Sequence, residues 1–380
     1  MQILKPDTEE QVVEAIRDAK APLSVEGQGT KQGFGHPVEV DTVLRLAGLS
    51  GVTMYEPDEM VFTAKAGTPL AEIEGVLAEK GQCLGFEPGE IGKLWNEGGS
   101  GGTIGGTVAA AIAGPRRFAA GAARDHLLGF TAVNGRGERF KAGGRVVKNV
   151  TGYDLPKLAA GSFGTLFAMT EVTLRALPRA QAATVLALEG KEPAEALRIL
   201  RAVAASPFEP SGLIHLATGG TPRTLIRLEG QSEGVAARAA ELSKTIAKDA
   251  RRLEADEGAR LFRAAADLHT LFDPETTLWR ASVPPARAHD MTTRVQPVAW
   301  FADAAGGILW LAFRNASDPA ALHAAARDLG GHATLVRKGP AQTDDVFPPL
   351  DTATLALTSR VKAAFDPARR LNPGRMYKGV

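Results

Sequence analysis

The residues best suited to chemistry lie in a glycine-rich loop near the N-terminus, where positions 22–35 read PLSVEGQGTKQGFG. Gly27 and Gly29 let backbone N–H groups approach an anion without an intervening side chain. Thr30 adds a hydroxyl donor and Lys31 a positive charge. The loop therefore predicts a bound phosphate, and a glycine-rich turn without a ligand is the alternative.

Two common phosphate-binding motifs do not fit this loop. A Rossmann fingerprint needs a third glycine three residues after the second, and a helix that begins there. Gln32 occupies that position, and His36 and Pro37 precede a strand pattern. The Gly-Lys-Ser/Thr sequence of a P-loop is also absent. Neither a Rossmann NAD site nor a P-loop is expected.

A second small-residue segment narrows the choice of ligand. Residues 98–114 read GGSGGTIGGTVAAAIAG. A tight turn does not need so many small residues, whereas a flat ring pressed against the backbone does. A packing face of a small-residue helix is the alternative. Together the two segments favour FAD, which carries both a pyrophosphate and a flat ring system.

Helices and strands that position these segments can be read from periodicity and caps. Thr8 and Gln11 form a capping box ahead of a helix with apolar residues at helical spacing. Thr68 as N-cap and Pro69 start a second helix, which Gly81 ends. Expected strands are Leu23–Glu26, Val38–Leu46, Met60–Ala66 and Phe167–Leu174, with a hairpin of Leu127–Asn134 and Glu138–Lys141.

The amino-acid composition changes after Pro178, which indicates a second domain. Glycines become rarer, and two alanine-rich helices are expected at Pro193–Ala204 and Gly234–Glu254. Short strands alternate with them, at Val185–Leu188, Leu213–Ala217 and Thr224–Leu228. The predicted fold class is α+β. The change in composition places a domain boundary near residue 180.

Composition excludes several classes of function. The 380 residues carry a net charge of +1, which gives no electrostatic basis for binding nucleic acid. Cys83 is the single cysteine, so the chain can form no internal disulfide and cannot ligate an iron–sulfur cluster alone. The first ten residues lack a signal-peptide pattern, and no apolar run is long enough to span a bilayer. A cytoplasmic protein is expected.

These segments resemble the vanillyl-alcohol-oxidase type of FAD-binding domain, also called PCMH-type. Matching text includes AGTPLAEIEGVLAEKG, RDHLLGFTAVNGRGERFKAGG, KNVTGYDLPKLAAGSFGTL and FDPARRLNPGRMY. Within that superfamily the chain is most similar to the E subunits of bacterial glycolate oxidase, through AGPRRF, VKNVTGYDL and GGHATLVR. The resemblance covers residues 3–178 and the C-terminal tail most strongly. It implies a FAD-binding domain at 1–178, a smaller α+β cap domain at 179–345 and a C-terminal segment at 346–380 that returns to the first domain.

The resemblance implies a set of cofactor-binding residues. The pyrophosphate loop would comprise Glu26, Gly27, Gln28, Gly29, Thr30, Lys31 and Gly33. The second stretch would comprise Thr103, Gly105, Gly106, Thr107 and Gly114. Further positions would be Pro88, the Arg124–Asp125 pair, Glu171, Val172 and Asn372. Covalent members attach the flavin through a histidine just after the glycines, where Thr30 and Lys31 stand here, so non-covalent FAD is implied.

The sequence departs from related dehydrogenases at several of these places. In their TIGGNVAENAGG, Thr107 replaces the first asparagine, Ala111 the second asparagine and Ala113 a glycine, and Phe163 replaces the glutamate of their GSEG. Individual ring contacts are therefore less certain to carry over than the fold.

A substrate site is less evident. Oxidation of a 2-hydroxy acid needs a base for the hydroxyl proton and a cation for the carboxylate. The seven histidines lack metal-ligand spacing, so no metal is expected. His332 is the best candidate base, although a strand-edge histidine is the favoured interpretation. Arg314 and Arg337 could bind a carboxylate, with structural roles as the favoured alternative. Arg116 and Arg117 could contact a flavin phosphate, a substrate or a partner. Tyr153 and Asp154 could be polar groups of an active site, but the resemblance places them on a packed turn and helix start.

The leading hypothesis is a FAD-binding subunit of a glycolate oxidase complex, which oxidises glycolate to glyoxylate. Such a subunit would transfer electrons between a catalytic flavin subunit and an iron–sulfur subunit, and would meet a membrane only through those partners. The catalytic residues are unidentified. A stand-alone FAD-dependent 2-hydroxy-acid dehydrogenase and a non-catalytic scaffold are the alternatives.

Overall fold

The computed structural model describes residues 1–95, 101–146, 152–268, 271–314, 318–339 and 345–380. The chain divides into two compact units. Unit 1 comprises Met1–Ile112, Gly121–Arg179 and Leu350–Val380, and unit 2 comprises Ala113–Ala120 and Ala180–Pro349. Each unit combines helices with antiparallel strands, which confirms the α+β class. The division into domains at 178 and 345 stays a prediction.

Unit 1 begins with a small parallel sheet in the order β1-β3-β2, formed by β1 (Gln2–Leu4), β3 (Thr42–Arg45) and β2 (Leu23–Glu26). Helix α1 (Glu9–Asp18) packs on it through Val12 and Ile16. The predicted capping box is present, since Gln11 N donates to Thr8 Oγ1 and Thr8 N to Gln11 Oε1. This sheet places the loop after β2.

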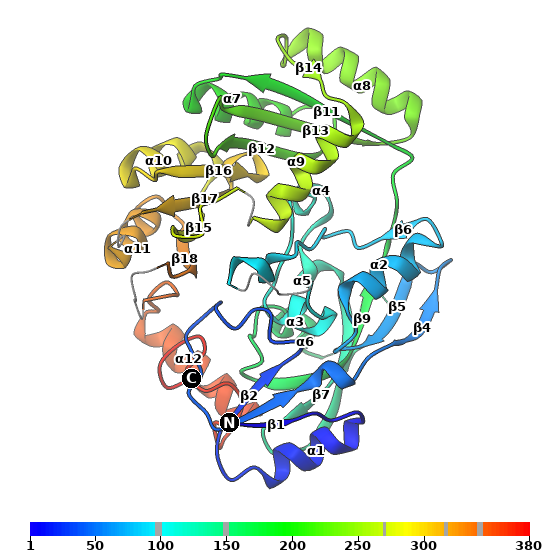
Figure 1. Cartoon of the computed structure of the whole chain (residues 1–380), viewed down its shortest axis with the longest axis vertical. Helices are drawn as coiled ribbons and strands as arrows, with labels where there is room; N and C mark the ends of the chain where they lie inside the picture. Colours follow the sequence, from blue (N-terminus) through cyan, green and yellow to red (C-terminus); the bar gives the residue numbers. More distant parts are fainter. Residues whose placement is uncertain (96–100, 147–151, 269–270, 315–317, 340–344) are drawn as a thin grey trace. The chain divides into compact units, whose positions relative to one another are not determined.

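A larger antiparallel sheet completes the core of unit 1 (Figure 1). Its order is β4-β5-β9-β7-β8, with β9 in the centre and the expected hairpin at β7 and β8. The strands are β4 (Val52–Glu56), β5 (Val61–Lys65), β7 (Leu127–Asn134), β8 (Arg139–Gly143) and β9 (Phe167–Arg175). Phe130 and Phe167 stack with ring centroids 5.0 Å apart at its centre.

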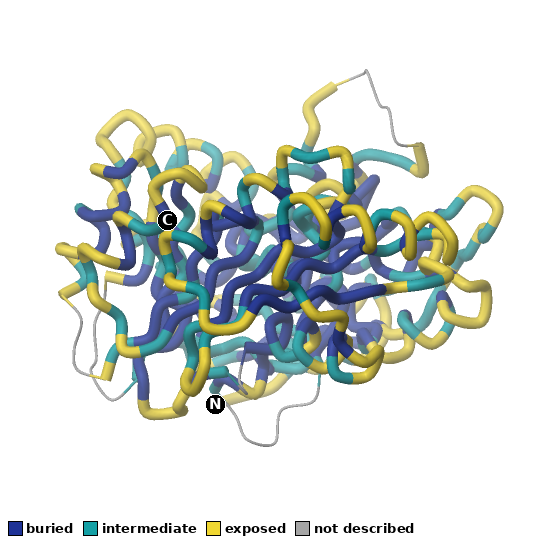
Figure 2. The backbone as a smooth tube through the Cα atoms, turned by 90° about the horizontal axis from the view of Figure 1, so that it is seen from above, coloured by how far each residue is buried: buried dark blue, intermediate teal, exposed yellow. Residues whose placement is uncertain are grey.

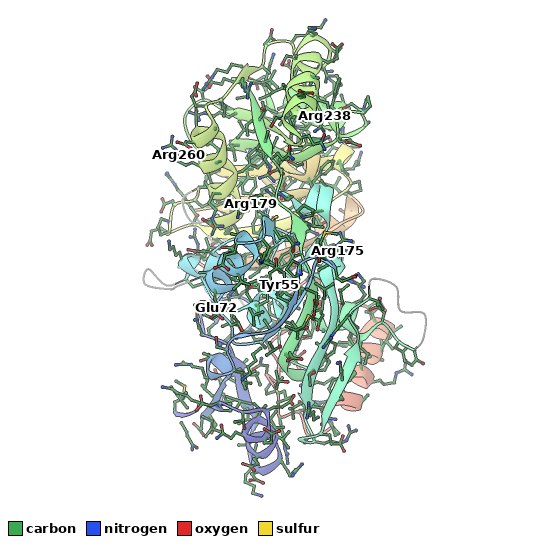
Figure 3. All side chains as sticks on the ribbon, turned by 90° about the vertical axis from the view of Figure 1, so that its right-hand side faces the viewer. Tyr55, Glu72, Arg175, Arg179, Arg238 and Arg260 are labelled. Carbon is green, nitrogen blue, oxygen red and sulfur yellow. The ribbon has the colours of Figure 1, made fainter. Side chains whose placement is uncertain are left out.

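The remaining elements of unit 1 are short. The helices are α2 (Leu70–Ala78), α3 (Ile104–Ala109), α5 (Ala123–His126), α6 (Leu155–Ala159) and α12 (Thr352–Phe365), with 3-10 turns η1 (Leu46–Gly48) and η2 (Ile91–Leu94). Strands β6 (Gln82–Cys83) and β10 (Leu177–Pro178) pair with each other. Tyr55 of β4, labelled in Figure 3, donates its hydroxyl hydrogen to Gln82 Oε1 at 3.0 Å.

Unit 2 is built on an eight-stranded antiparallel sheet, in the order β14-β11-β13-β12-β16-β17-β15-β18. The strands are β11 (Ala182–Glu189), β12 (Pro210–Ala217), β13 (Arg223–Gly230), β14 (Arg251–Arg252), β15 (Thr277–Ser282), β16 (Ala299–Asp303), β17 (Ile308–Phe313) and β18 (His332–Arg337). The helices are α4 (Arg117–Ala120), α7 (Pro193–Ala204), α8 (Ser232–Thr245), α9 (Ala255–Asp267), α10 (Ala288–Val295) and α11 (Pro319–Asp328), with 3-10 turns η3 (Pro285–Arg287) and η4 (Ala304–Gly306).

The two faces of this sheet differ. One face packs beneath α7, α8, α10 and α11, and carries apolar side chains such as Trp279, Leu309 and Leu213. On the other face α9 packs against β11 and β12, where Gly212 leaves room for the ring of Phe262. Arg238 of α8, labelled in Figure 3, donates to the carbonyls of Phe208 and Glu229. Figure 2 shows long continuous stretches of buried backbone, in dark blue, bordered by exposed segments.

Four expectations from the sequence need correction. The strand predicted over Val38–Leu46 is shorter, because β1 and β2 pair only with its residues Thr42–Arg45. Thr68 does not cap α2. Its hydroxyl donates to Lys65 O at 2.6 Å and accepts from Gly51 N, and Pro69 holds the N-cap position. The helix predicted to reach Glu254 ends at Thr245, since Arg251 and Arg252 pair with β11. Helix α12 was not foreseen.

Candidate functional site

A pocket lies in unit 1, where the loop after β2 meets the start of α3. Both segments that the sequence selected contribute to its wall. The lining residues that were predicted are Glu26, Gly27, Gln28, Gly29, Thr30, Lys31, Thr103, Gly105, Gly106 and Asn372. The structure thus brings together the two glycine-rich segments, although residues 98–100 of the second lie outside the described part of the chain.

The loop after β2 can donate hydrogen bonds. Within the described residues, the backbone N–H groups of Gly29, Thr30 and Lys31 have no intramolecular acceptor. Gly29 has a φ of 74°, in the left-handed region that favours glycine. A side chain at Gly27 would overlap Thr103 Oγ1, so glycine is required there by close approach. These free donors suit an anion such as a pyrophosphate.

Lys31 supplies the positive charge of this loop. Its Nζ lies 3.3 Å from Thr30 Oγ1, and desolvation by burial lowers the pKa of the amine from its ordinary value to about 8. A neighbouring anion favours the charged form and would raise the pKa again. The amine is therefore placed to respond to a bound phosphate.

Glu26 serves a different purpose from its neighbours. Its carboxylate accepts from Arg45 Nε at 2.7 Å and from Gln32 Nε2 at 2.5 Å. A carboxylate would repel a pyrophosphate, and these two partners offset its charge while they hold the loop in shape. Glu26 therefore positions the loop.

The start of α3 offers close packing instead of donors. The N–H groups of its first residues are already used, by Ile104 to Thr68 O, Gly105 to Ala66 O and Gly106 to Thr103 Oγ1. A Cβ on Gly105 would lie 2.7 Å from Ala66 Cβ. The glycines here create a thin wall, which is what a flat ligand needs.

Apolar side chains form much of the remaining pocket wall, and the sequence reasoning did not select them. They are Val25, Leu46, Ala66, Ala109, Ala110, Phe163, Phe167 and Met169. Phe167 and Met169 are two residues apart on β9 and therefore point to the same side of the sheet. The strand was predicted, but which of its faces meets a ligand depends on the layer packed against it.

The C-terminal tail closes one side of the pocket. Asn372 Oδ1 accepts from Val25 N at 2.7 Å, and its Nδ2 donates to Phe163 O at 2.8 Å. Arg375 donates to Lys31 O at 2.9 Å and to Gln32 Oε1 at 2.7 Å. Burial lowers the pKa of Arg375 to about 10, and Glu26 opposes that shift. Asn372 was predicted to approach the site, whereas Arg375 was missed.

A buried ion pair fixes the tail in unit 1. Lys362 Nζ donates to Asp366 Oδ2 at 2.8 Å and to Leu371 O at 2.7 Å. The carboxylate of Asp366 also accepts from the backbone N–H groups of Arg370 and Leu371. Both side chains are almost fully buried, at 1% and 0% exposure. The pair therefore sets the direction in which the chain leads to Asn372 and Arg375.

Eight predicted site residues lie outside the pocket wall. Gly114 belongs to unit 2, and the others, in unit 1, are Gly33, Pro88, Thr107, Arg124, Asp125, Glu171 and Val172. Gly33 leaves room for the ring of Trp95. Asp125 accepts from Ala122 N at 2.9 Å and caps α5, and Glu171 accepts from Thr53 Oγ1 at 3.0 Å. Contact of these residues with a cofactor stays a prediction.

The weaker substrate-site candidates mostly have structural partners. Arg337 donates to the carbonyls of Thr276 and Asp273 at 3.0 and 2.6 Å. Arg116 forms a two-point ion pair with Glu229 at 3.1 and 2.7 Å. Asp154 caps α6 by accepting from Lys157 N, at the predicted helix start. Tyr153 is exposed, so the packed turn expected for it is wrong, and His332 is also exposed. His269 and residues 147–151 lie outside the described ranges.

Comparison with known proteins identifies the family. Residues 2–143 match the profile of a family described as FAD binding domain. Over 370 residues the chain is 36% identical to the glycolate oxidase subunit GlcE of Escherichia coli K12, covering 97% of this chain and 96% of that protein. The chain belongs to the glycolate oxidase subunit GlcE family. The GlcE-family chain is also 25% identical over 404 residues to the glycolate oxidase subunit GlcD of Bacillus subtilis, covering 94% of this chain and 84% of that protein.

Solved structures support the fold of the GlcE-family chain. p-Cresol methylhydroxylase superposes with a TM-score of 0.73 at 14% identity, covering 98% of this chain and 88% of that protein. An alkyldihydroxyacetonephosphate synthase superposes with a TM-score of 0.71 at 16% identity, covering 98% of this chain and 76% of that protein. The expected PCMH-type fold is confirmed.

FAD is the cofactor of this GlcE-family chain, and the pocket fits it. The free donors at Gly29, Thr30 and Lys31, with the Lys31 amine, suit its pyrophosphate. The thin wall at Gly105 and the apolar side chains suit its ring systems. Bound FAD supplies an acceptor for hydride and a donor of electrons. The loop after β2 and the apolar wall of the pocket would hold and orient it.

The pH dependence of FAD binding tests the role of Lys31. Protonated Lys31 attracts the pyrophosphate and the neutral amine does not, so affinity is highest below the pKa of about 8. Above that pH the affinity should fall, by up to about tenfold per pH unit until the higher pKa of the bound state is reached. Lys31→Met should bind FAD more weakly at neutral pH and lose this decline.

Titration of the apoprotein with FAD, followed by quenching of flavin fluorescence from neutral pH to about 9.5, measures this effect. Lys93→Met is the control, because Lys93 is exposed and pairs with Glu90 at 3.6 Å outside the pocket. Equal pH profiles for Lys31→Met and the unmodified chain would remove Lys31 from phosphate binding.

Proposed function

We propose that this chain is the FAD-binding subunit of a glycolate oxidase complex, a FAD-dependent oxidoreductase that converts glycolate to glyoxylate. The observation that carries the proposal is the 36% identity to an E. coli glycolate oxidase subunit over 97% of the chain. The pocket supports the proposal, because the unpaired N–H groups of the loop, Lys31 and the apolar side chains all line the same pocket.

We assign to the bound flavin a role in electron transfer within that complex. The proposed partners are a catalytic flavin subunit, for which the similarity to a GlcD protein is the support, and an iron–sulfur subunit. A single cysteine cannot supply the four thiolates of a typical cluster, so the cluster would lie in another chain. The flavin is held without a covalent bond, since Thr30 and Lys31 stand where covalent relatives have histidine.

The proposed compartment is the cytoplasm, with contact to a membrane only through the partners. Among the helices in the described ranges, none combines the length and apolar character needed to cross a bilayer. We further propose that residues 1–178 bind FAD, that 179–345 form a cap and that 346–380 complete the cofactor site. The ion pair of Lys362 with Asp366 supports this last assignment.

Flavin reduction by glycolate tests the proposed function. The purified chain should be yellow with one FAD per chain, and glycolate should not bleach its oxidised flavin band. Co-purified with its partners, the same chain should pass electrons from glycolate to an external acceptor. Bleaching of the chain alone would instead indicate a stand-alone 2-hydroxy-acid dehydrogenase. A colourless protein that does not bind added FAD would indicate a non-catalytic scaffold.

A further inference from the structure

The sheet of unit 2 carries a polar and aromatic group on the face opposite its main apolar core. Arg280 of β15 pairs in register with Trp310 of β17, which pairs in turn with Phe301 of β16. Paired residues of antiparallel strands point to the same face. Trp279 and Leu309, one position away, point into the core under the helices. Arg280 therefore stands on the opposite face, beside two aromatic rings stacked at 6.1 Å.

Three basic side chains come together at this place. Thr334 of β18 is the register partner of Arg280, and His332 lies two residues before it, on the same face. Arg117 begins α4, which packs against β12 of the same sheet. The positive charge of Arg117 acts on Arg280, and that of Arg280 acts on His332. We call Arg117, Arg280 and His332 the basic cluster.

The two arginines of the basic cluster differ from their neighbours in having no acceptor. In the described ranges, neither the Arg280 nor the Arg117 guanidinium forms a hydrogen bond or an ion pair. Arg116, next to Arg117, is bound at two points by Glu229, and Arg337 is bound by carbonyl oxygens. Arg280 and Arg117 are both half-buried, so their guanidinium groups can meet an acceptor from solution.

The electrostatics of the basic cluster favour an added anion. Burial and the charge of Arg117 lower the pKa of Arg280 to about 10, with Asp303 acting in the opposite direction. Asp303 Oδ1 accepts from Ala304 N at 2.6 Å and caps the following turn. The guanidinium groups of Arg280 and Arg117 repel each other more strongly because they are poorly solvated. A carboxylate bound between them would offset this repulsion. A guanidinium matches a carboxylate with two parallel hydrogen bonds.

We propose that the basic cluster is a carboxylate-binding site for a small 2-hydroxy or 2-oxo acid. Arg280 and Arg117 bind the carboxylate, and the Thr334 hydroxyl and His332 lie on the same face for the oxygen at carbon 2. The stacked rings of Phe301 and Trp310 bound the site on one side and favour a short acid. The choice of acid class rests on the proposed function, whereas the site itself rests on the unpaired guanidinium groups.

Calorimetric titration of the full FAD-loaded chain tests this site. Glycolate and glyoxylate should bind, and glycolamide, which lacks the carboxylate, should bind about ten- to a hundredfold more weakly. Arg280→Met should weaken glycolate binding by a similar factor, and Arg280→Lys by less. Arg287→Met is the matched control, because Arg287 is exposed and pairs with Asp290 at 3.0 Å. Its glycolate affinity should be unchanged.

Flavin content and the circular dichroism spectrum establish that each variant is folded. If Arg280→Met does not fold, Arg117→Met, at the start of a short surface helix, gives the same comparison. Equal binding of glycolamide and glycolate, or unchanged binding by the folded arginine variants, would overturn the proposal. A third result would also overturn it: the unmodified chain binds no carboxylate, and the Arg280→Met variant no longer co-purifies with the partner subunits. The basic cluster would then bind an acidic side chain of a partner.

This test is separable from that of the proposed function. Binding heat does not depend on flavin reduction, so a carboxylate site can be present in a chain whose complex fails to oxidise glycolate. Conversely, a complex that oxidises glycolate while Arg280→Met and Arg117→Met keep normal carboxylate binding would leave the proposed function intact and remove this site.

Discussion

Gly27→Ala is expected to weaken FAD binding by about a hundredfold or more, equivalent to about 3 kcal/mol. The added methyl group would overlap the Thr103 hydroxyl, which accepts from Gly106 N and caps α3. Relief of the overlap requires the loop after β2 and the start of α3 to move apart. That movement displaces the free donors at Gly29, Thr30 and Lys31 from the thin wall at Gly105. Flavin stoichiometry after purification, and titration of the apoprotein with FAD, measure the loss.

A second glycine provides the control for this substitution. Gly75 lies within α2, and a Cβ there meets nothing within 4 Å. Gly75→Ala should therefore keep full flavin content and gain up to about 1 kcal/mol of stability from helix propensity. Normal FAD affinity in Gly27→Ala would mean that the two segments tolerate separation, and the pocket would not depend on their close approach.

Lys362→Met is expected to destabilise unit 1 by about 3–5 kcal/mol, because it leaves the Asp366 carboxylate buried without its counter-charge. The backbone of Leu371 would also lose its hydrogen bond from Lys362. Since the same tail carries Asn372 and Arg375 to the pocket, flavin should be released at a lower temperature as well. Thermal unfolding followed in parallel by circular dichroism and by flavin fluorescence measures both effects.

Two companion variants separate the loss of the ion pair from a general effect of replacing lysine. Lys191 forms surface ion pairs with Glu195 at 3.1 Å and with Asp249 at 3.2 Å, and Lys191→Met should change stability much less than Lys362→Met. Adding Asp366→Asn to Lys362→Met removes the uncompensated charge and should recover part of the loss. A Lys362→Met protein as stable as Lys191→Met would show that the tail is held by other contacts.

Local patterns in the sequence were sufficient for much of unit 1. The capping box of Thr8 and Gln11, the strand at Leu23–Glu26 and the hairpin of β7 and β8 were all predicted and are present. Each depends on neighbours within a few positions, or on the two-residue period of a strand. The loop at Gly27–Lys31 was equally accessible, because glycines and a lysine have chemical properties that do not need distant partners to be recognised.

The tertiary structure decided which residues share the pocket and which charges are paired. Arg375 reaches Lys31 across 344 positions, and Asn372 reaches Val25 across 347. Arg116 and Arg117 are adjacent in the chain, yet Arg116 is paired with Glu229, 113 positions away, while Arg117 has no acceptor in the described ranges. Local periodicity reports which face of an element is apolar, not what is packed against it. The sequence therefore predicted a bound phosphate through the chemistry of this loop, and FAD through the two glycine-rich segments together. The contacts of the C-terminal tail with the loop, and the basic cluster, depend on neighbours that only folding brings together.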